Sequence, residues 1–118
     1  MFSELEKYKT DHFFLDPDSD IVKECNAPAG KGGVYIVYAL ARGKIEMVFI
    51  GASNDLAKDL KDEPSWMQNL TLEQPHSIDI YWYVTEDKKN HDKPEDVERT
   101  ILQIHINLYG ELPRWNGK

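Results

Sequence analysis

The sequence contains a single cysteine, Cys25, among its 118 residues. One cysteine cannot form an internal disulfide, which excludes the small secreted domains that depend on a disulfide framework. No apolar run approaches the roughly 18 residues that a membrane-spanning helix needs, and the first residues do not resemble a signal peptide. We therefore expect a cytoplasmic protein with no membrane partner.

Basic residues are also scarce. The chain has 14 Lys and Arg residues against 21 Asp and Glu residues, which gives a net charge of −7. Affinity for phosphate groups comes mainly from Lys and Arg, so this balance disfavours broad, nonspecific binding to nucleic acid. A small local basic patch remains compatible with the overall charge.

Hydrophobic residues make up 41% of the chain, and the length suits one globular domain with one core. Near the N-terminus, residues 1–10 are predicted to form a short helix. A second short helix is predicted over 19–25, after the aspartate-rich turn at 16–20. We predict that residues 1–30 are an extension that packs on a domain formed by residues 31–118.

The centre of the chain reads as strands. Residues 33–41 and 44–50 are rich in β-branched and aromatic residues, and Arg42-Gly43 between them suits a tight hairpin turn. Residues 77–84 alternate between apolar and polar side chains, which indicates a third strand with one buried face.

Helices are predicted between and after these strands. A first begins at a Ser53 or Asn54 cap, and a second follows Pro64. The clearest helix begins at Pro94 and ends at Gly110. Its buried stripe is predicted to consist of Val97, Ile101, Ile104 and Leu108. Together these elements predict an α+β fold, a small three-stranded, mainly antiparallel sheet flanked by helices.

Several short motifs occur in a fixed order along this predicted fold. Gly33-Val34-Tyr35 opens the hairpin and Phe49-Ile50-Gly51 closes it. Glu98 follows in the last helix, and the chain ends in Pro113-x-x-Asn116. From about residue 30 to 118 this order resembles the GIY-YIG nuclease superfamily. Residues 70–118 are similar to a small group of bacterial GIY-YIG-like proteins.

The resemblance implies metal-assisted cleavage of phosphodiesters. In the family, two hairpin tyrosines lie near the attacking water, an arginine of the first helix neutralises the phosphate, a glutamate holds a divalent metal and an asparagine braces the site. Carried onto this chain, the resemblance implies Tyr35 as the first tyrosine, Glu98 as the Mg²⁺ ligand and Asn116 as the brace. Gly33 and Gly51 are the motif glycines.

Two positions depart from the family pattern. Phe49 stands in place of the second tyrosine and has no hydroxyl. Asp59 stands where the arginine is expected and would repel the phosphate, although it could instead be a second metal ligand. Loss of one donor that stabilises the transition state commonly costs about 3 kcal/mol in the barrier, so the departures predict impaired catalysis.

Structural interpretations of the same residues remain open. Tyr35 could be a half-buried strand aromatic, Glu98 a surface residue beside the apolar stripe, and Asn116 a group that ties down the tail. The favoured hypothesis is a catalytically impaired module that binds nucleic acid or protein. The alternatives are an active Mg²⁺-dependent DNA endonuclease and a purely structural protein-interaction domain with no ligand in the cleft.

Overall fold

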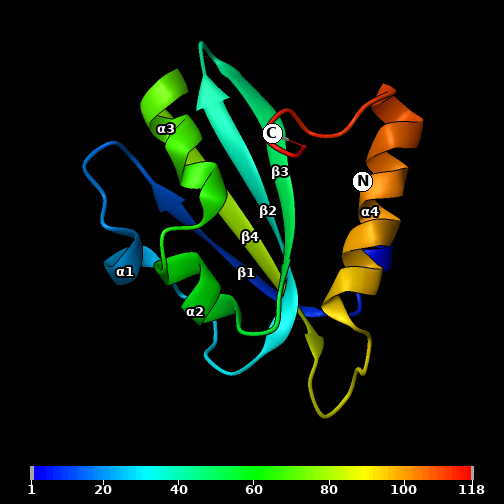
Figure 1. Cartoon of the computed structure of the whole chain (residues 1–118). Helices are drawn as coiled ribbons and strands as arrows, with labels where there is room; N and C mark the ends of the chain where they lie inside the picture. Colours follow the sequence, from blue (N-terminus) through cyan, green and yellow to red (C-terminus); the bar gives the residue numbers. More distant parts are fainter. Residues whose placement is uncertain (1, 118) are drawn as a thin grey trace.

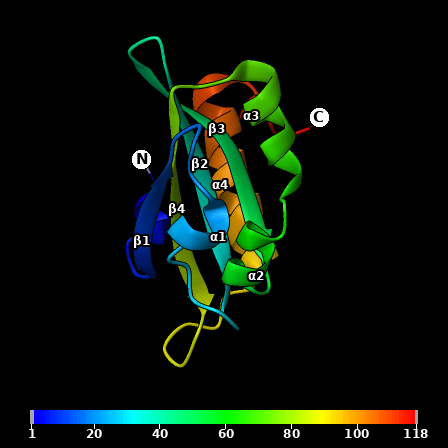
Figure 2. The same cartoon turned by 90° about the vertical axis from the view of Figure 1, so that its left-hand side faces the viewer.

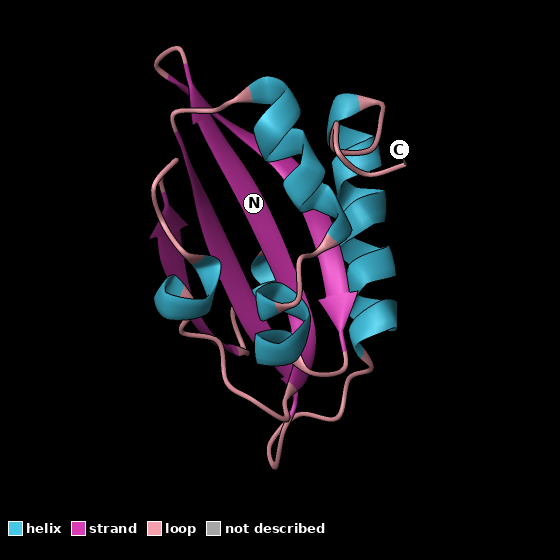
Figure 3. Cartoon of the chain, turned by 60° about the vertical axis from the view of Figure 1, so that its left-hand side comes forward, coloured by secondary structure: helices cyan, strands magenta, loops and turns pink. Residues whose placement is uncertain are grey.

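The computed structural model describes residues 2–117. Its centre is an open, antiparallel, four-stranded sheet in the order β1-β4-β2-β3, with helices on both sides (Figures 1 and 3). The strands are β1 (Lys9–Leu15), β2 (Gly32–Ala41), β3 (Lys44–Ser53) and β4 (Ser77–Glu86). The predicted α+β class is confirmed.

The prediction of three strands was wrong, because a fourth strand lies near the N-terminus. Residues 9–15 form β1, and the predicted first helix shrinks to a single 3-10 turn at Ser3–Leu5. β1 lies at one edge of the sheet, beside β4 (Figure 2), and pairs with it from Lys9 opposite Val84 to Leu15 opposite Ile78. An edge strand with one solvated face keeps polar residues, and these hid the strand pattern.

The predicted hairpin is confirmed. β2 and β3 pair along their length, and Arg42 and Gly43 both adopt positive φ, 55° and 74°, as tight two-residue hairpin turns require. A bulge leaves Val48 without a partner in β2, and both Val48 and Phe49 then pack into the same core. The bulge therefore lets two consecutive residues of β3 face the same core.

The helices divide between the two faces of the sheet. On one face lie α1 (Ile21–Glu24), α2 (Leu56–Lys61), a 3-10 turn at Ser65–Met67 and α3 (Gln68–Glu73), and on the other lies α4 (Pro94–Tyr109), as Figure 1 shows. Each face has its own core. The first contains Tyr35, Ile80, Trp82, Leu60 and Trp66, and the second contains Val34, Ile36, Ile50, Val97 and Ile101.

Helix α4 begins at Pro94 and is followed by Gly110 with φ 80°, both as predicted. Its buried stripe differs from the prediction, because Leu108 is 58% exposed whereas His105 is only 6% exposed. The His105 ring is satisfied in place, since Nδ1 lies 2.7 Å from the carbonyl oxygen of Glu111. Within residues 2–117, none of the helices has the length and apolar character needed to cross a bilayer.

Candidate functional site

The side chains that the motif pointed to gather around Gly51 at the outer edge of β3. Gly51 lies opposite Tyr35 in the β2–β3 pairing. A Cβ atom on Gly51 would lie 2.7 Å from Cε2 of Phe49 and 2.8 Å from Cζ of Tyr35. Two aromatic rings therefore cross over this backbone position, and only glycine leaves room for both. We call Tyr35, Phe49, Gly51, Asp59, Glu98 and Asn116 the Gly51 cluster.

Tyr35 is the buried centre of the cluster, with 6% of its surface exposed. Its hydroxyl accepts a hydrogen bond of 3.2 Å from Nε1 of Trp66. Burial raises the pKa of Tyr35 to about 12, the Trp66 donation lowers it, and the carboxylates of Asp59 and Glu98 raise it further. The phenol is therefore neutral at physiological pH, and very little of it is present as phenolate.

Phe49 is a packing residue. Its ring centroid lies 5.9 Å from that of Tyr35 and 6.4 Å from that of Trp66. The three rings form one continuous aromatic contact on the face covered by α2 and α3. Phe49 thus supplies the shape of the expected ring and no polar group.

Asp59 is held at its position by the end of β3. The Ser53 hydroxyl donates to Oδ2 of Asp59 at 2.5 Å, and Oγ of Ser53 accepts from the Asp55 backbone N–H at 2.9 Å. The predicted cap of α2 at Ser53 or Asn54 was wrong, because Asp55 caps the helix by accepting from Lys58 N–H. Ser53 is consequently free to orient the Asp59 carboxylate.

Glu98 reaches the cluster from α4, on the other face of the sheet. Burial raises the pKa of its carboxyl, and a hydrogen bond from the Ala52 backbone lowers it. No three His, Cys, Asp or Glu side chains within residues 2–117 form a group that could hold a metal ion. Carboxylate oxygens suit Mg²⁺, which commonly keeps several waters. Glu98 is the residue that would hold such an ion, and the ion would supply charge neutralisation.

Asn116 binds the backbone of β3 with both ends of its amide. Oδ1 accepts from Ile50 N–H at 3.0 Å, and Nδ2 donates to the Ile50 carbonyl at 2.9 Å. Trp115 N–H donates to the Val48 carbonyl at 2.9 Å. The tail, drawn in red in Figure 1, therefore returns from α4 and lies along the outer edge of β3.

Most of the expected site residues therefore meet in one place. Asn116 and Glu98 hydrogen-bond to Ile50 and Ala52, two positions of the same strand, and Tyr35 reaches them across Gly51.

Gly33 stands apart from the cluster and serves the sheet. It pairs with Ser53 on one side and Val84 on the other. A Cβ atom there would lie 1.9 Å from the Tyr83 carbonyl oxygen. This glycine is needed for the close approach of β2 to β4.

Arg114, a basic residue of the tail, forms ion pairs outside the Gly51 cluster. The Arg114 guanidinium lies 2.8 Å from Glu46 and 2.9 Å from Glu73. Glu73 also accepts from Nε1 of Trp115 at 2.8 Å. These contacts clamp the tail between β3 and α3, so the charge of Arg114 is already balanced by two carboxylates.

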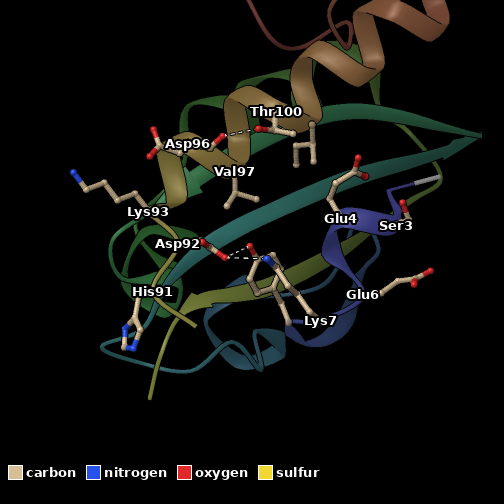
Figure 4. Close-up of a pocket in the computed structure, with 12 residues that line it drawn as sticks. Ser3, Glu4, Glu6, Lys7, His91, Asp92, Lys93, Asp96, Val97 and Thr100 are labelled. Carbon is tan, nitrogen blue, oxygen red and sulfur yellow. Dashed lines mark hydrogen bonds and ion pairs between the residues drawn. The ribbon is translucent and has the colours of Figure 1, made fainter. Parts of the chain in front are cut away.

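A second candidate region is a charged cavity of about 740 Å³ between the N-terminal turn and α4 (Figure 4). The Tyr8 hydroxyl donates to Asp92 at 2.6 Å, and Nζ of Lys7 lies 3.3 Å from the same carboxylate. These contacts lower the pKa of Asp92. The polar groups at this end of the cavity are satisfied by one another, and they tie the N-terminal turn to the loop before α4.

Sequence reasoning missed two residues that hydrogen-bond to predicted site residues. Trp66 donates to the Tyr35 hydroxyl, and Ser53 orients Asp59. Neither has a motif signal, because Trp66 reads as a core residue and Ser53 as a helix cap. A buried tyrosine needs a polar partner, and that rule alone would have prompted a search for one.

No protein-family model matches this chain, and no curated protein matches it.

Proposed function

We propose that this chain is a GIY-YIG-like module that works by binding a protein partner and does not cleave phosphodiesters. The observation that carries the proposal is the charge around Tyr35. Two carboxylates, those of Asp59 and Glu98, bear on its hydroxyl together with one indole N–H from Trp66. This is an electronegative environment at the place where the resemblance would put an anionic phosphate.

The chemistry of cleavage supports this interpretation. A phosphodiester must be neutralised before a water can attack it, and a preorganised cation commonly contributes about 3 kcal/mol. Asp59 replaces that cation by an opposite charge that Ser53 holds in place. The pKa of about 12 at Tyr35 also makes its phenolate scarce at neutral pH.

A protein partner is favoured over a nucleic acid by the overall charge. The net charge of −7 opposes association with a polyphosphate backbone. We also propose a cytoplasmic location. A chain with one cysteine forms no internal disulfide, and disulfide-free chains are typical of the reducing cytosol.

An active Mg²⁺-dependent endonuclease is the second candidate. It is favoured by the meeting of Tyr35, Glu98 and Asn116 around Gly51, in agreement with the roles that the resemblance implies. In that case Glu98 would hold the metal, Asn116 would keep the tail and β3 in register, and Tyr35 would orient the water.

A nuclease assay separates the two candidates. Single-stranded, double-stranded and branched DNA and RNA are incubated with the protein at low salt, with Mg²⁺ or Mn²⁺. Glu98→Ala is compared with Glu95→Ala, an exposed glutamate of the same helix. We expect no cleavage by the wild type or by either variant. Metal-dependent cleavage that is lost in Glu98→Ala and kept in Glu95→Ala would contradict the proposal.

A restoring variant tests whether the two departures explain the inactivity. Asp59→Arg combined with Phe49→Tyr returns the expected cation and hydroxyl to the cluster. Measurable cleavage by this folded double variant, with none by the wild type, would support a scaffold that has lost its chemistry through these positions.

A further inference from the structure

The sheet face that carries α4 is only partly covered. The helix packs over Val34, Ile36 and Ile50 of β2 and β3. Farther along the same face, side chains of all four strands line a cavity of about 230 Å³. We call this cavity the Asp79 pocket, with Phe14, Tyr38, Asp79 and Tyr81 as its defining residues.

The register of the sheet places a carboxylate between aromatic rings. Asp79 of β4 lies opposite Phe14 of β1 and opposite Tyr38 of β2, so the three residues form one row across the sheet. Neighbouring strands are about 4.8 Å apart. The Cα atoms of Phe14 and Tyr38 are therefore roughly 10 Å apart, and both side chains line the cavity beside Asp79.

Tyr81 closes the row from the next position of β4. Its ring meets the ring of Tyr38 edge-on, with centroids 5.5 Å apart. The opposite flank of Tyr81 is fixed by His12, which stacks on it at 4.6 Å and 7°. Three aromatic side chains therefore surround Asp79, and at least one of them is held by a neighbouring strand.

Asp79 keeps bonding capacity for a ligand. Oδ1 lies 2.9 Å from Nδ1 of His12, and within the described part of the chain Oδ2 has no hydrogen-bond donor. The side chain is 19% exposed, so the carboxylate is largely withdrawn from water and still reachable. A partly desolvated anion beside aromatic faces attracts a cation through both Coulomb and cation–π forces.

Tyr38 and Tyr81 are partly buried, whereas two apolar side chains of the pocket are open to solvent. Phe14 is 59% exposed, and Ile45, which also lines the pocket, is 74% exposed. Exposed apolar side chains that gather around a single polar group are typical of a binding surface.

We propose that the Asp79 pocket binds an arginine side chain presented by a protein partner. The planar guanidinium would enter between the rings of Phe14 and Tyr38, stack on them and hydrogen-bond to Oδ2 of Asp79. Arginine suits this arrangement because it is flat, always charged, and forms directed bonds to carboxylates. The proposal does not depend on whether the Gly51 cluster cleaves phosphodiesters.

Two other occupants are less compatible with the same observations. Unpaired RNA bases also stack on exposed aromatic rings, but the Asp79 carboxylate and the net charge of −7 oppose the phosphates that accompany them. A second copy of this chain would place one Asp79 carboxylate near the other, which is unfavourable without a cation between them.

The test is a titration of the full-length protein with a short peptide of alternating arginine and glycine, followed by amide chemical shifts. The matched probe is the same peptide with citrulline in place of arginine, which keeps the shape and removes the charge. The pH is slightly alkaline, where an ordinary imidazole is neutral. We expect shifts at Phe14, Tyr38 and Asp79 with the arginine peptide, and at least about tenfold weaker binding of the citrulline peptide.

Two variants sharpen the test. Asp79→Asn should lower the affinity for the arginine peptide by at least about tenfold. Asp11→Asn is an equal charge change on an exposed residue of β1 and should leave this affinity unchanged. Equal binding of the two peptides, or an unaltered affinity in Asp79→Asn, would overturn the proposal. So would shifts at these residues on addition of oligouridine alone, or shifts that depend only on protein concentration.

Discussion

The Gly51 cluster and the Asp79 pocket are built from the same chemical groups and differ in what those groups touch. Each combines tyrosine and phenylalanine rings with carboxylates on the same sheet. In the Gly51 cluster the Tyr35 hydroxyl accepts a hydrogen bond from the Trp66 indole N–H, and Asp59 accepts one from the Ser53 hydroxyl. In the Asp79 pocket Phe14 is 59% exposed, and within the described residues Oδ2 of Asp79 has no hydrogen-bond donor.

Residue types alone therefore do not identify a binding site. The motif residues of the hairpin lie in the core and at its edge, where the Tyr35 hydroxyl and one Asp59 oxygen are bound by other protein groups. The residues around Asp79 carry no motif, and the register of three strands brings them together. Substitutions should therefore affect stability at the first place and ligand binding at the second.

The largest difference is expected between two aromatic truncations. Trp66 is 1% exposed, and Trp66→Ala should lower the free energy of unfolding by about 3–5 kcal/mol because it opens a cavity in the core. Phe14→Ala removes an exposed ring and should cost less than about 1 kcal/mol. Urea unfolding of both variants measures the difference, and similar values would contradict the division into a buried cluster and an open pocket.

A smaller effect is expected at Gly51. Gly51→Ala places a methyl group against the rings of Phe49 and Tyr35, at 2.7 and 2.8 Å. Overpacking of this kind costs about 1–3 kcal/mol. In the double variant Gly51→Ala with Phe49→Leu, the shorter side chain should recover part of the loss. Strictly additive effects in urea unfolding would show that the rings do not impose the glycine.

Removal of one hydroxyl should have a more modest effect. Tyr35→Phe leaves the buried Trp66 indole N–H without its acceptor, which should cost about 1–2 kcal/mol. The matched change Tyr81→Phe lies in the Asp79 pocket and should stay within about 0.5 kcal/mol. Equal losses in the two variants would argue against the Trp66–Tyr35 hydrogen bond.

The raised pKa of Tyr35 predicts that the protein loses stability at alkaline pH. Its pKa rises from 10.0 to about 12 on folding, so the folded state favours the neutral phenol. The stabilising contribution is complete below pH 10.0 and is lost as the pH approaches about 12. Unfolding free energies measured across this interval should fall less steeply in Tyr35→Phe than in the wild type. Identical slopes would place the hydroxyl in solvent.

The smallest effect on stability is expected at Asp79. Asp79→Asn removes one charge from a side chain that has only one hydrogen-bond partner within residues 2–117, His12. The free energy of unfolding should therefore change by less than about 0.5 kcal/mol. Thermal unfolding monitored by circular dichroism measures this change. A loss of several degrees in the midpoint would mean that Asp79 holds the sheet together through His12 and is not primarily a ligand-binding group.

The elements that carry strong local signals were predictable from the sequence. The hairpin follows from β-branched runs around Arg42-Gly43, and α4 follows from Pro94, an acidic first turn and Gly110. β1 was missed because an edge strand tolerates polar residues such as His12, and its pairing partner lies far away in the chain. Long-range pairing of this kind leaves little trace in a local pattern.

The candidate site was predictable in part. Gly51, Glu98 and Asn116 were named from an ordered motif, and they meet at one strand edge. The partners that hydrogen-bond to the Gly51 cluster, Trp66 and Ser53, come from tertiary packing and could not be read from spacing. The same holds for the row that surrounds Asp79, since its register depends on a strand that the sequence did not reveal.

The C-terminal tail has a further consequence for solution behaviour. Trp115 and Asn116 occupy the hydrogen-bonding groups of Val48 and Ile50 that β3 would otherwise present to solvent. An uncovered strand edge is a template on which other copies can add strands and aggregate. Residues 115 and 116 thus cover part of this edge, and a chain shortened before Pro113 should aggregate before it loses its fold.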